Sequence, residues 1–169
     1  MSVLELLAAV GVVVLVIGRQ LRGEPLRGKR LVLLPAILTV IGAVDLGRGG
    51  HHPTATDIGC IVVGALIAAG IGVAQGSVLR LEHRGGGLWG RMPVSGLWLW
   101  AGLVVSRLAM MGIAGSMGAH VAASTAPILL MLGINRLGQA AAVVPRSLAS
   151  GIPLAPEKDG SVFLSGRLR

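Results

Sequence analysis

Aromatic and charged side chains are scarce in this 169-residue sequence, which has no tyrosine, one phenylalanine and three tryptophans. Charged residues make up 13% of the chain and hydrophobic residues 53%. A soluble domain needs a more highly charged surface than this. The lack of stacking aromatics and of a basic helix face also argues against a nucleic-acid partner, in spite of the net charge of +8.

Cysteine is nearly absent as well, since Cys60 is the only one. A single cysteine excludes an internal disulfide and a two-thiol redox couple, so we interpret Cys60 as a small apolar residue within a helix. The N-terminal stretch MSVLELLAAV has no basic residue before its apolar run. It therefore does not resemble a cleavable signal peptide, and we expect the first helix to remain attached.

Long apolar runs are what the sequence has instead. Runs of about 20 apolar residues are long enough to cross the ~30 Å hydrocarbon core of a bilayer, and a helix satisfies its own backbone there. We therefore predict an all-α bundle of five transmembrane helices, in a single domain over residues 1–145, followed by a flexible cytoplasmic tail over 146–169. The predicted spans are residues 3–18, 31–46, 55–79, 93–114 and 126–144.

Proline and threonine support these boundaries. Proline is tolerated in the first turn of a helix, where its missing N–H is not needed. We expect Thr54 or Thr56 to cap the third helix, Thr125 to cap the fifth, and Pro145 to end the fifth. An alternative fifth span over 121–135 places Pro127 in mid-helix, and we prefer the later one. The prolines at or near predicted starts are Pro35, Pro53, Pro93 and Pro127.

The basic residues alternate between the two sides of the membrane. The four loops and the C-terminal tail carry 5, 1, 3, 0 and 4 lysines and arginines in chain order. Because cytoplasmic loops are enriched in these residues, the alternation predicts an N-terminus outside and a C-terminus inside. The expected location is the bacterial inner membrane.

The third loop, VLRLEHRGGGLWGRMP, predicts a small cytoplasmic β-hairpin. Leu79, Leu81 and His83 alternate with charged residues, and Gly85 and Gly86 are able to adopt the positive φ of a tight turn. A flexible glycine loop is the alternative.

These features together resemble the CcdC-like family of small bacterial membrane proteins, particularly its actinobacterial members. The resemblance covers roughly residues 10–144 and depends on order and loose motifs. They are the basic loop and helix RQLRGEPLRGKRLVLLPAILTVIG, the hairpin RLEHRGGGLWGR and the arginine-bearing LWLWAGLVVSRL. The resemblance implies the fold and the compartment, and an association with cytochrome c maturation, but it carries over no catalytic residue.

Arg107 is the single charge in residues 94–114. It lies thirteen residues beyond Val94, or ~20 Å along the helix from its inner end. An unpaired charge at such depth costs at least ~2.5 kcal/mol, so we predict an ion pair with a carboxylate. Such a pair is interpreted as structural, with an ion relay or anionic-ligand site as the functional alternative and snorkelling of Arg107 as the third. The candidate carboxylates on the outer side are Asp45, Glu5 and Asp57.

Small residues recur every four positions on the third helix, which predicts close helix packing. The partner is either another helix of the chain or a second protomer, and Gln75 beside the stripe is expected to hydrogen-bond across it. In the fifth helix a polar patch is interpreted as interior helix contacts, with a substrate path as the alternative. The stripe is Gly64, Ala68, Gly72 and Gly76, and the patch is Asn135, Arg136 and Gln139.

Histidines and methionines gather on the predicted outer side. Imidazole and thioether groups suit copper or haem iron, but no diagnostic spacing is present, so these histidines are weak metal candidates and no cofactor is expected. The residues are His51, His52 and His120, with Met110, Met111 and Met117 nearby.

No catalytic or phosphate-binding motif occurs in the sequence, so an enzyme is not expected. The leading hypothesis is an accessory or assembly factor of the bacterial envelope with a membrane-protein partner. The alternatives are a small-solute or ion transporter using the polar cluster around Arg107, and a haem- or copper-binding membrane protein.

Overall fold

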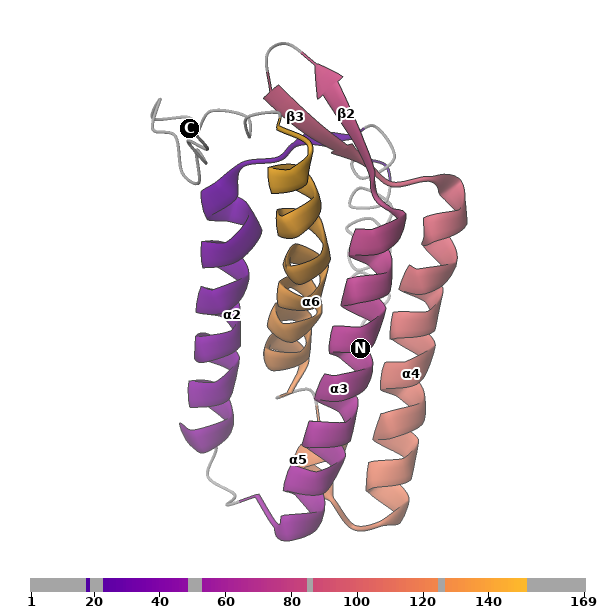
Figure 1. Cartoon of the computed structure of the whole chain (residues 1–169). Coiled ribbons are helices and arrows are strands. Elements are labelled where there is room, and N and C mark those ends of the chain that lie inside the picture. The colour runs from indigo at the N-terminus through magenta and orange to yellow at the C-terminus, as the bar shows by residue number, and fades with distance from the viewer. Residues whose placement is uncertain (1–17, 19–22, 49–52, 85–86, 125–126, 152–169) are drawn as a thin grey trace.

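The computed structural model describes residues 18, 23–48, 53–84, 87–124 and 127–151, and within them four long helices form a bundle (Figure 1). The long helices are α2 (Gly28–Arg48), α3 (Ala55–Val78), α4 (Leu97–Ser116) and α6 (Ile128–Ala149). The short elements are β1 (Glu24–Pro25), β2 (Arg80–Arg84), β3 (Gly87–Arg91), the 3-10 helix η1 (Val94–Gly96) and α5 (His120–Ala123).

Four helical segments of the described chain are long and apolar enough to cross a membrane. They are Leu31–Arg48, Ala55–Val78, Val94–Ser116 and Ile128–Ala149, and they match the second to fifth predicted spans. The predicted first span over residues 3–18 lies outside the described residues apart from Gly18, so the number five stays a prediction. The mostly helical architecture is confirmed.

Helix α6 lies between α2 and α3 because glycine lets the backbones approach closely (Figure 1). On α3, a Cβ added to Gly76 would lie 2.5 Å from the carbonyl oxygen of Gln139 on α6. On α6, a Cβ on Gly138 would lie 2.5 Å from the carbonyl oxygen of Ala69. Apolar side chains gain nothing by leaving lipid for one another, so such close backbone packing is what joins membrane helices.

Two prolines lie inside helices where the sequence predicted boundaries. Pro35 is eight residues into α2, and Pro145 lies within α6, which continues to Ala149. The prediction that Pro145 ends the helix is wrong: the turn beyond it persists because Val143 and Ser147, one on each side, are buried against the bundle. The predicted start near Pro127 is confirmed, since α6 begins at Ile128, but the residue at the N-cap position is Pro127 and not the predicted Thr125. Residues 152–169 lie outside the described part.

The predicted hairpin is confirmed, and a third strand joins it. β2 and β3 pair antiparallel with Leu81 opposite Gly90 and His83 opposite Leu88. The short β1 pairs with the other edge of β3, giving the order β1-β3-β2. The sequence pattern missed β1 because it is two residues long and contains a proline, which is tolerated only at a sheet edge.

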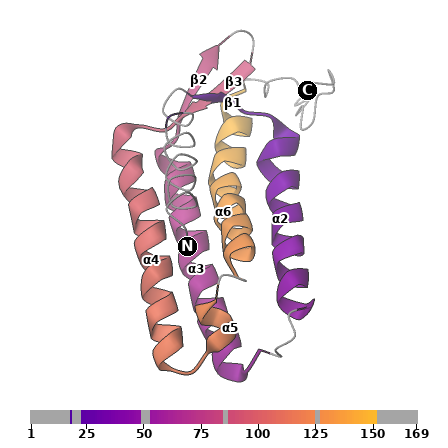
Figure 2. The ribbon, with the colours of Figure 1, turned by 180° about the vertical axis from the view of Figure 1, so that it is seen from behind.

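The two ends of the bundle carry different elements, with the sheet at one end and α5 at the other (Figure 2). At one end, a cluster of buried residues joins the sheet to the helices: Leu26, Leu79, Leu88, Met92 and Val143. At the opposite end, α5 and its flanks pack against the start of α3 and the end of α4 through Ala114, Ala119 and Ala122. The segment that ties the helices together at this second end contains the site described next.

Candidate functional site: the Asp57–Ala122–Arg107 clamp

The chain between α4 and α6 folds back into the bundle instead of crossing the outside of it. Helix α5 has only four residues, and Ser124 after it is extended. Ala119, Ala122 and Pro127 are nonetheless buried. Non-helical backbone at membrane depth is tolerated only where protein or water satisfies its polar groups. The buried N–H and C=O groups of this segment therefore require partners.

Asp57 supplies one of those partners. It is the third residue of α3 and only 2% exposed. Its Oδ1 accepts a hydrogen bond from the backbone N–H of Ala122 at 2.9 Å. Its Oδ2 accepts from the backbone N–H of Thr54 at 2.9 Å and from the Thr54 hydroxyl at 2.7 Å, while the Thr54 hydroxyl accepts from the Asp57 N–H at 3.2 Å. The predicted cap is thus Thr54 and not Thr56, and this capping box fixes the Asp57 carboxylate.

Arg107 supplies the other partners. It reaches from the middle of α4 to α5 (residues 120–123) and donates from Nη1 to the carbonyl oxygen of Ala122 at 3.2 Å. Its Nη2 donates to the carbonyl oxygen of Ser124 at 2.5 Å. Asp57 and Arg107 therefore hold the N–H and the C=O of the same residue, Ala122, and we call this arrangement the Asp57–Ala122–Arg107 clamp.

A direct ion pair of Arg107 is not what the described residues show. No ion pair joins Arg107 to Asp45 or Asp57 among these residues. Asp57 and Arg107 are instead connected through Ala122, whose N–H binds Asp57 and whose C=O binds Arg107. Asp45 is exposed on α2. The sequence analysis named Asp57 among the candidate partners of Arg107 in a direct ion pair, but the guanidinium binds backbone carbonyls instead. Glu5 lies outside the described residues, so a pair with it stays a prediction.

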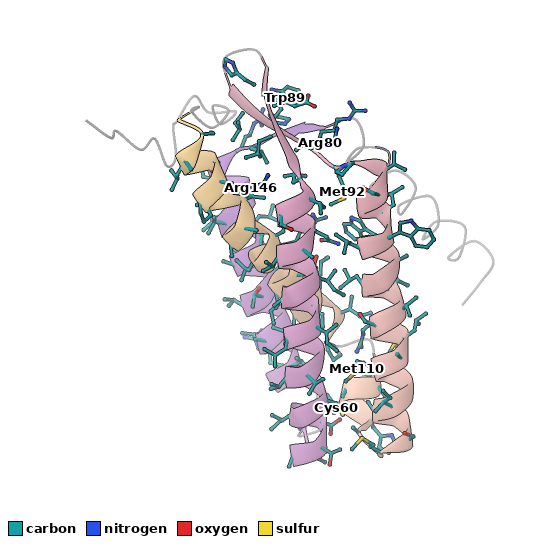
Figure 3. The ribbon with its side chains drawn as sticks, turned by 45° about the vertical axis from the view of Figure 1, so that its right-hand side comes forward. Cys60, Arg80, Trp89, Met92, Met110 and Arg146 are labelled. Atoms are coloured by element: carbon teal, nitrogen blue, oxygen red, sulfur yellow. The ribbon has the colours of Figure 1, made fainter. Side chains whose placement is uncertain are left out.

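A small cavity lies beside the clamp, between α3 and α4. Its volume is about 30 Å³, which is room for one or two water molecules. Figure 3 shows Cys60 on α3 and Met110 on α4 at this level of the bundle. The lining is mostly apolar, with Ser106 and Arg107 as its polar members and Met131 of α6 closing one side. The Nε of Arg107 is buried and has no hydrogen-bond partner in the segments that the structure describes.

The small-residue stripe of α3 faces α6 of the same chain. A Cβ on Gly64 would lie 3.1 Å from the end of Met131, and one on Gly72 would overlap the backbone of Asn135. Ala68 is buried in the same face. Of the two predicted partners, the structure therefore shows the intrachain one for the stripe, and a second protomer would have to use another face of α3.

The polar patch of α6 divides between two neighbours. Asn135 is fully buried, and its Nδ2 donates to the carbonyl oxygen of Ala68 on α3 at 3.0 Å. Arg136 donates from Nη1 to Oε1 of Gln139 at 2.8 Å and stacks over the ring of Trp100 on α4 at 5.1 Å. Gln75 is also fully buried, yet neither of its amide atoms has a hydrogen-bond partner among the described residues, which therefore do not show the expected hydrogen bond across the stripe.

Of the three weak metal candidates, His120 alone lies in the described part of the chain. His51 and His52 lie outside the described residues, and His120 is exposed at the start of α5. Within the described part of the chain, no group of three or more histidine, cysteine, aspartate or glutamate side chains is placed to hold a metal ion. Of the nearby methionines, Met110 lines the cavity and Met117 is exposed.

The two acceptors of Arg107 could not be identified from the sequence, because every residue has a backbone carbonyl and nothing distinguishes those of Ala122 and Ser124. At the other end of the bundle, Arg146 uses the same chemistry and donates to the carbonyl oxygen of Gly76 at 2.6 Å.

Comparison with known proteins found no matching protein family, no matching curated protein and no matching solved structure.

Proposed function

We propose that this chain is an accessory or assembly factor of the bacterial inner membrane that binds a membrane-protein partner. The observation that supports this proposal is the use of the buried polar groups. Asp57, Arg107 and Asn135 each bind the backbone of another segment of the chain. Their hydrogen bonds stabilise the bundle, and the outer faces of its helices are left as large apolar surfaces.

Helix α4 belongs to the least buried of the four segments that are long and apolar enough to cross a membrane. Its large exposed side chains include Trp98, Val104, Val105, Leu108 and Ile113. Its closest neighbours are α3 and α5, whereas α6 is packed on both sides by α2 and α3. A helix with one covered edge and a wide apolar remainder suits docking of another transmembrane helix, which makes α4 the expected partner surface. The resemblance to the CcdC-like family makes cytochrome biogenesis or envelope redox chemistry the first context to examine.

Site-specific photo-crosslinking combined with purification tests this proposal. A photoreactive residue at Val105 or Leu108 on α4 should crosslink to one protein, and the same protein should co-purify in stoichiometric amount in mild detergent. Val40, which is exposed to a similar degree on α2, is the matched control. Lipid adducts alone at all three positions, with no co-purifying protein, would overturn the proposal.

The cavity beside Arg107 favours a second candidate, a transporter of ions or very small solutes. Arg107 and Ser106 give it a polar side within the segment of α4 that is long and apolar enough to cross a membrane. Cys60 lines the same cavity and is the only cysteine, so it reports directly on access. Uptake into liposomes that is blocked by a charged thiol reagent in the wild type, but not in Cys60→Ala, would favour transport over the accessory role.

A further inference from the structure

Two arginines face each other across the hairpin. Arg80 opens β2, Arg91 closes β3, and the two are direct cross-strand partners. Both are exposed. The Cβ atoms of directly opposite residues are ~5 Å apart, and like charges at such positions destabilise a sheet. The fold thus places two arginines side by side at one defined place, and Arg91 has further contacts there.

This arginine pair lies at the base of the hairpin, where the sheet joins the helices. Arg80 follows the last residue of α3, Val78, by two positions, and Arg91 precedes η1 by three. Just beyond it, Val94 is 71% exposed and Trp98, in the first turn of α4, is 80% exposed. Tryptophan is enriched at the membrane–water interface, so we expect the arginine pair at the level of the lipid headgroups.

The surroundings of the arginine pair are basic. At the sheet end, the cationic residues whose side chains the structure describes are Arg27, Lys29, Arg80, Arg91 and Arg146. Among the described side chains there, Glu82 is the one carboxylate, and its cross-strand partner is Trp89. Arg91 and Glu82 take part in other interactions as well, which leaves Arg80 as the clearer position for substitution.

We infer that Arg80 and Arg91 bind the phosphate of an anionic phospholipid. Arginine binds phosphate oxygens through paired charge-assisted hydrogen bonds, and a phosphate between two guanidinium groups removes their repulsion. The exposed side chains of Val94 and Trp98 continue from the arginine pair along α4 and offer contact to an acyl chain. This apolar continuation favours a lipid over free phosphate. The inference is independent of any protein partner.

Thermal unfolding of the purified full-length protein in a neutral detergent tests this inference. Phosphatidylglycerol should raise the melting temperature of the wild type, whereas phosphatidylcholine should not. Arg80→Gln should weaken the apparent affinity for phosphatidylglycerol about fivefold, the effect of one basic residue at an anionic surface. Without lipid, the same variant should be at least as stable as the wild type, because the like-charge pair is gone. Arg48→Gln, at the opposite end of the bundle, is the matched control and should respond like the wild type.

Arg80→Glu guards against a variant that fails to fold, because the new carboxylate faces Arg91 and forms a favourable cross-strand pair. It should keep the fold and lose the response to phosphatidylglycerol. An unchanged response in Arg80→Gln and Arg80→Glu would overturn the inference. So would an equal loss in Arg48→Gln, an equal response to phosphatidylcholine, or an equal shift with inorganic phosphate alone.

Discussion

Asp57 and Arg107 bind opposite polar groups of the same residue, although they lie on different helices. Asp57 accepts from the N–H of Ala122 at 2.9 Å, and Arg107 donates to its C=O at 3.2 Å. Hydrogen bonds to charged groups contribute about 1.5–3 kcal/mol each, more than those between neutral groups. The charges of Asp57 and Arg107 are thus separated by Ala122. The clamp holds the folded-back segment around Ala122 in place, and each charged group has a hydrogen-bond partner.

The glycine stripe gives the first prediction. Gly72→Ala should destabilise the bundle by about 1–3 kcal/mol, as overpacking does in other cores, because the added Cβ overlaps the backbone of Asn135. Gly70→Ala is the matched control, since a Cβ there meets nothing within 4 Å. Thermal unfolding in detergent measures both. Equal melting temperatures for the two variants would show that α3 and α6 do not pack as closely as described.

The second prediction concerns the capping box of Thr54 and Asp57. Thr54→Ala should cost about 1 kcal/mol, because the N–H of Asp57 loses its acceptor and the Asp57 carboxylate loses one donor. Thr56→Ala replaces an exposed threonine two residues further along and should change the melting temperature little. A larger loss of stability in Thr56→Ala than in Thr54→Ala would show that Thr54 is not the capping residue.

Gln75 and Asn135 should respond oppositely to apolar replacement. Both are fully buried, but Asn135 donates to Ala68, whereas neither amide atom of Gln75 has a partner within the described part of the chain. Gln75→Met should be neutral or stabilising by up to about 3 kcal/mol, because an unsatisfied buried amide is removed. Asn135→Leu should destabilise. If Gln75→Met lowers the melting temperature as much as Asn135→Leu does, Gln75 has a partner that the described structure lacks.

Orientation is tested by reporter fusions. The alternation of basic loops predicts five spans with the C-terminus inside. A reporter that is active only in the cytoplasm should be active when fused after Arg169 and silent when fused at Gly49. The reverse result would invert the topology, and activity at both positions would change the number of spans.

The sequence predicted the spans and the hairpin because both depend on local patterns. Apolar runs of fixed length define helices in a membrane, and Leu81 and His83 alternate with charged residues toward a glycine turn. The strand Glu24–Pro25 and helix α5 have no such pattern, since β3 and the bundle impose their conformations. The partners of Arg107 were missed for a different reason: they are backbone carbonyls, and their burial is decided by tertiary structure.

The central claim, that Asp57 and Arg107 act together on the segment around Ala122, is tested most directly by a double-mutant cycle. Arg107→Leu and Asp57→Leu should each destabilise the protein in detergent, since each leaves a polar group of Ala122 without its partner. Because both residues bind Ala122, the double variant should lose less free energy of unfolding than the sum of the two single losses, by about 0.5–3 kcal/mol. Asp45→Leu is the control, and its loss should add to that of Arg107→Leu within about 0.5 kcal/mol. Additivity between Asp57 and Arg107, together with coupling between Asp45 and Arg107, would contradict the clamp.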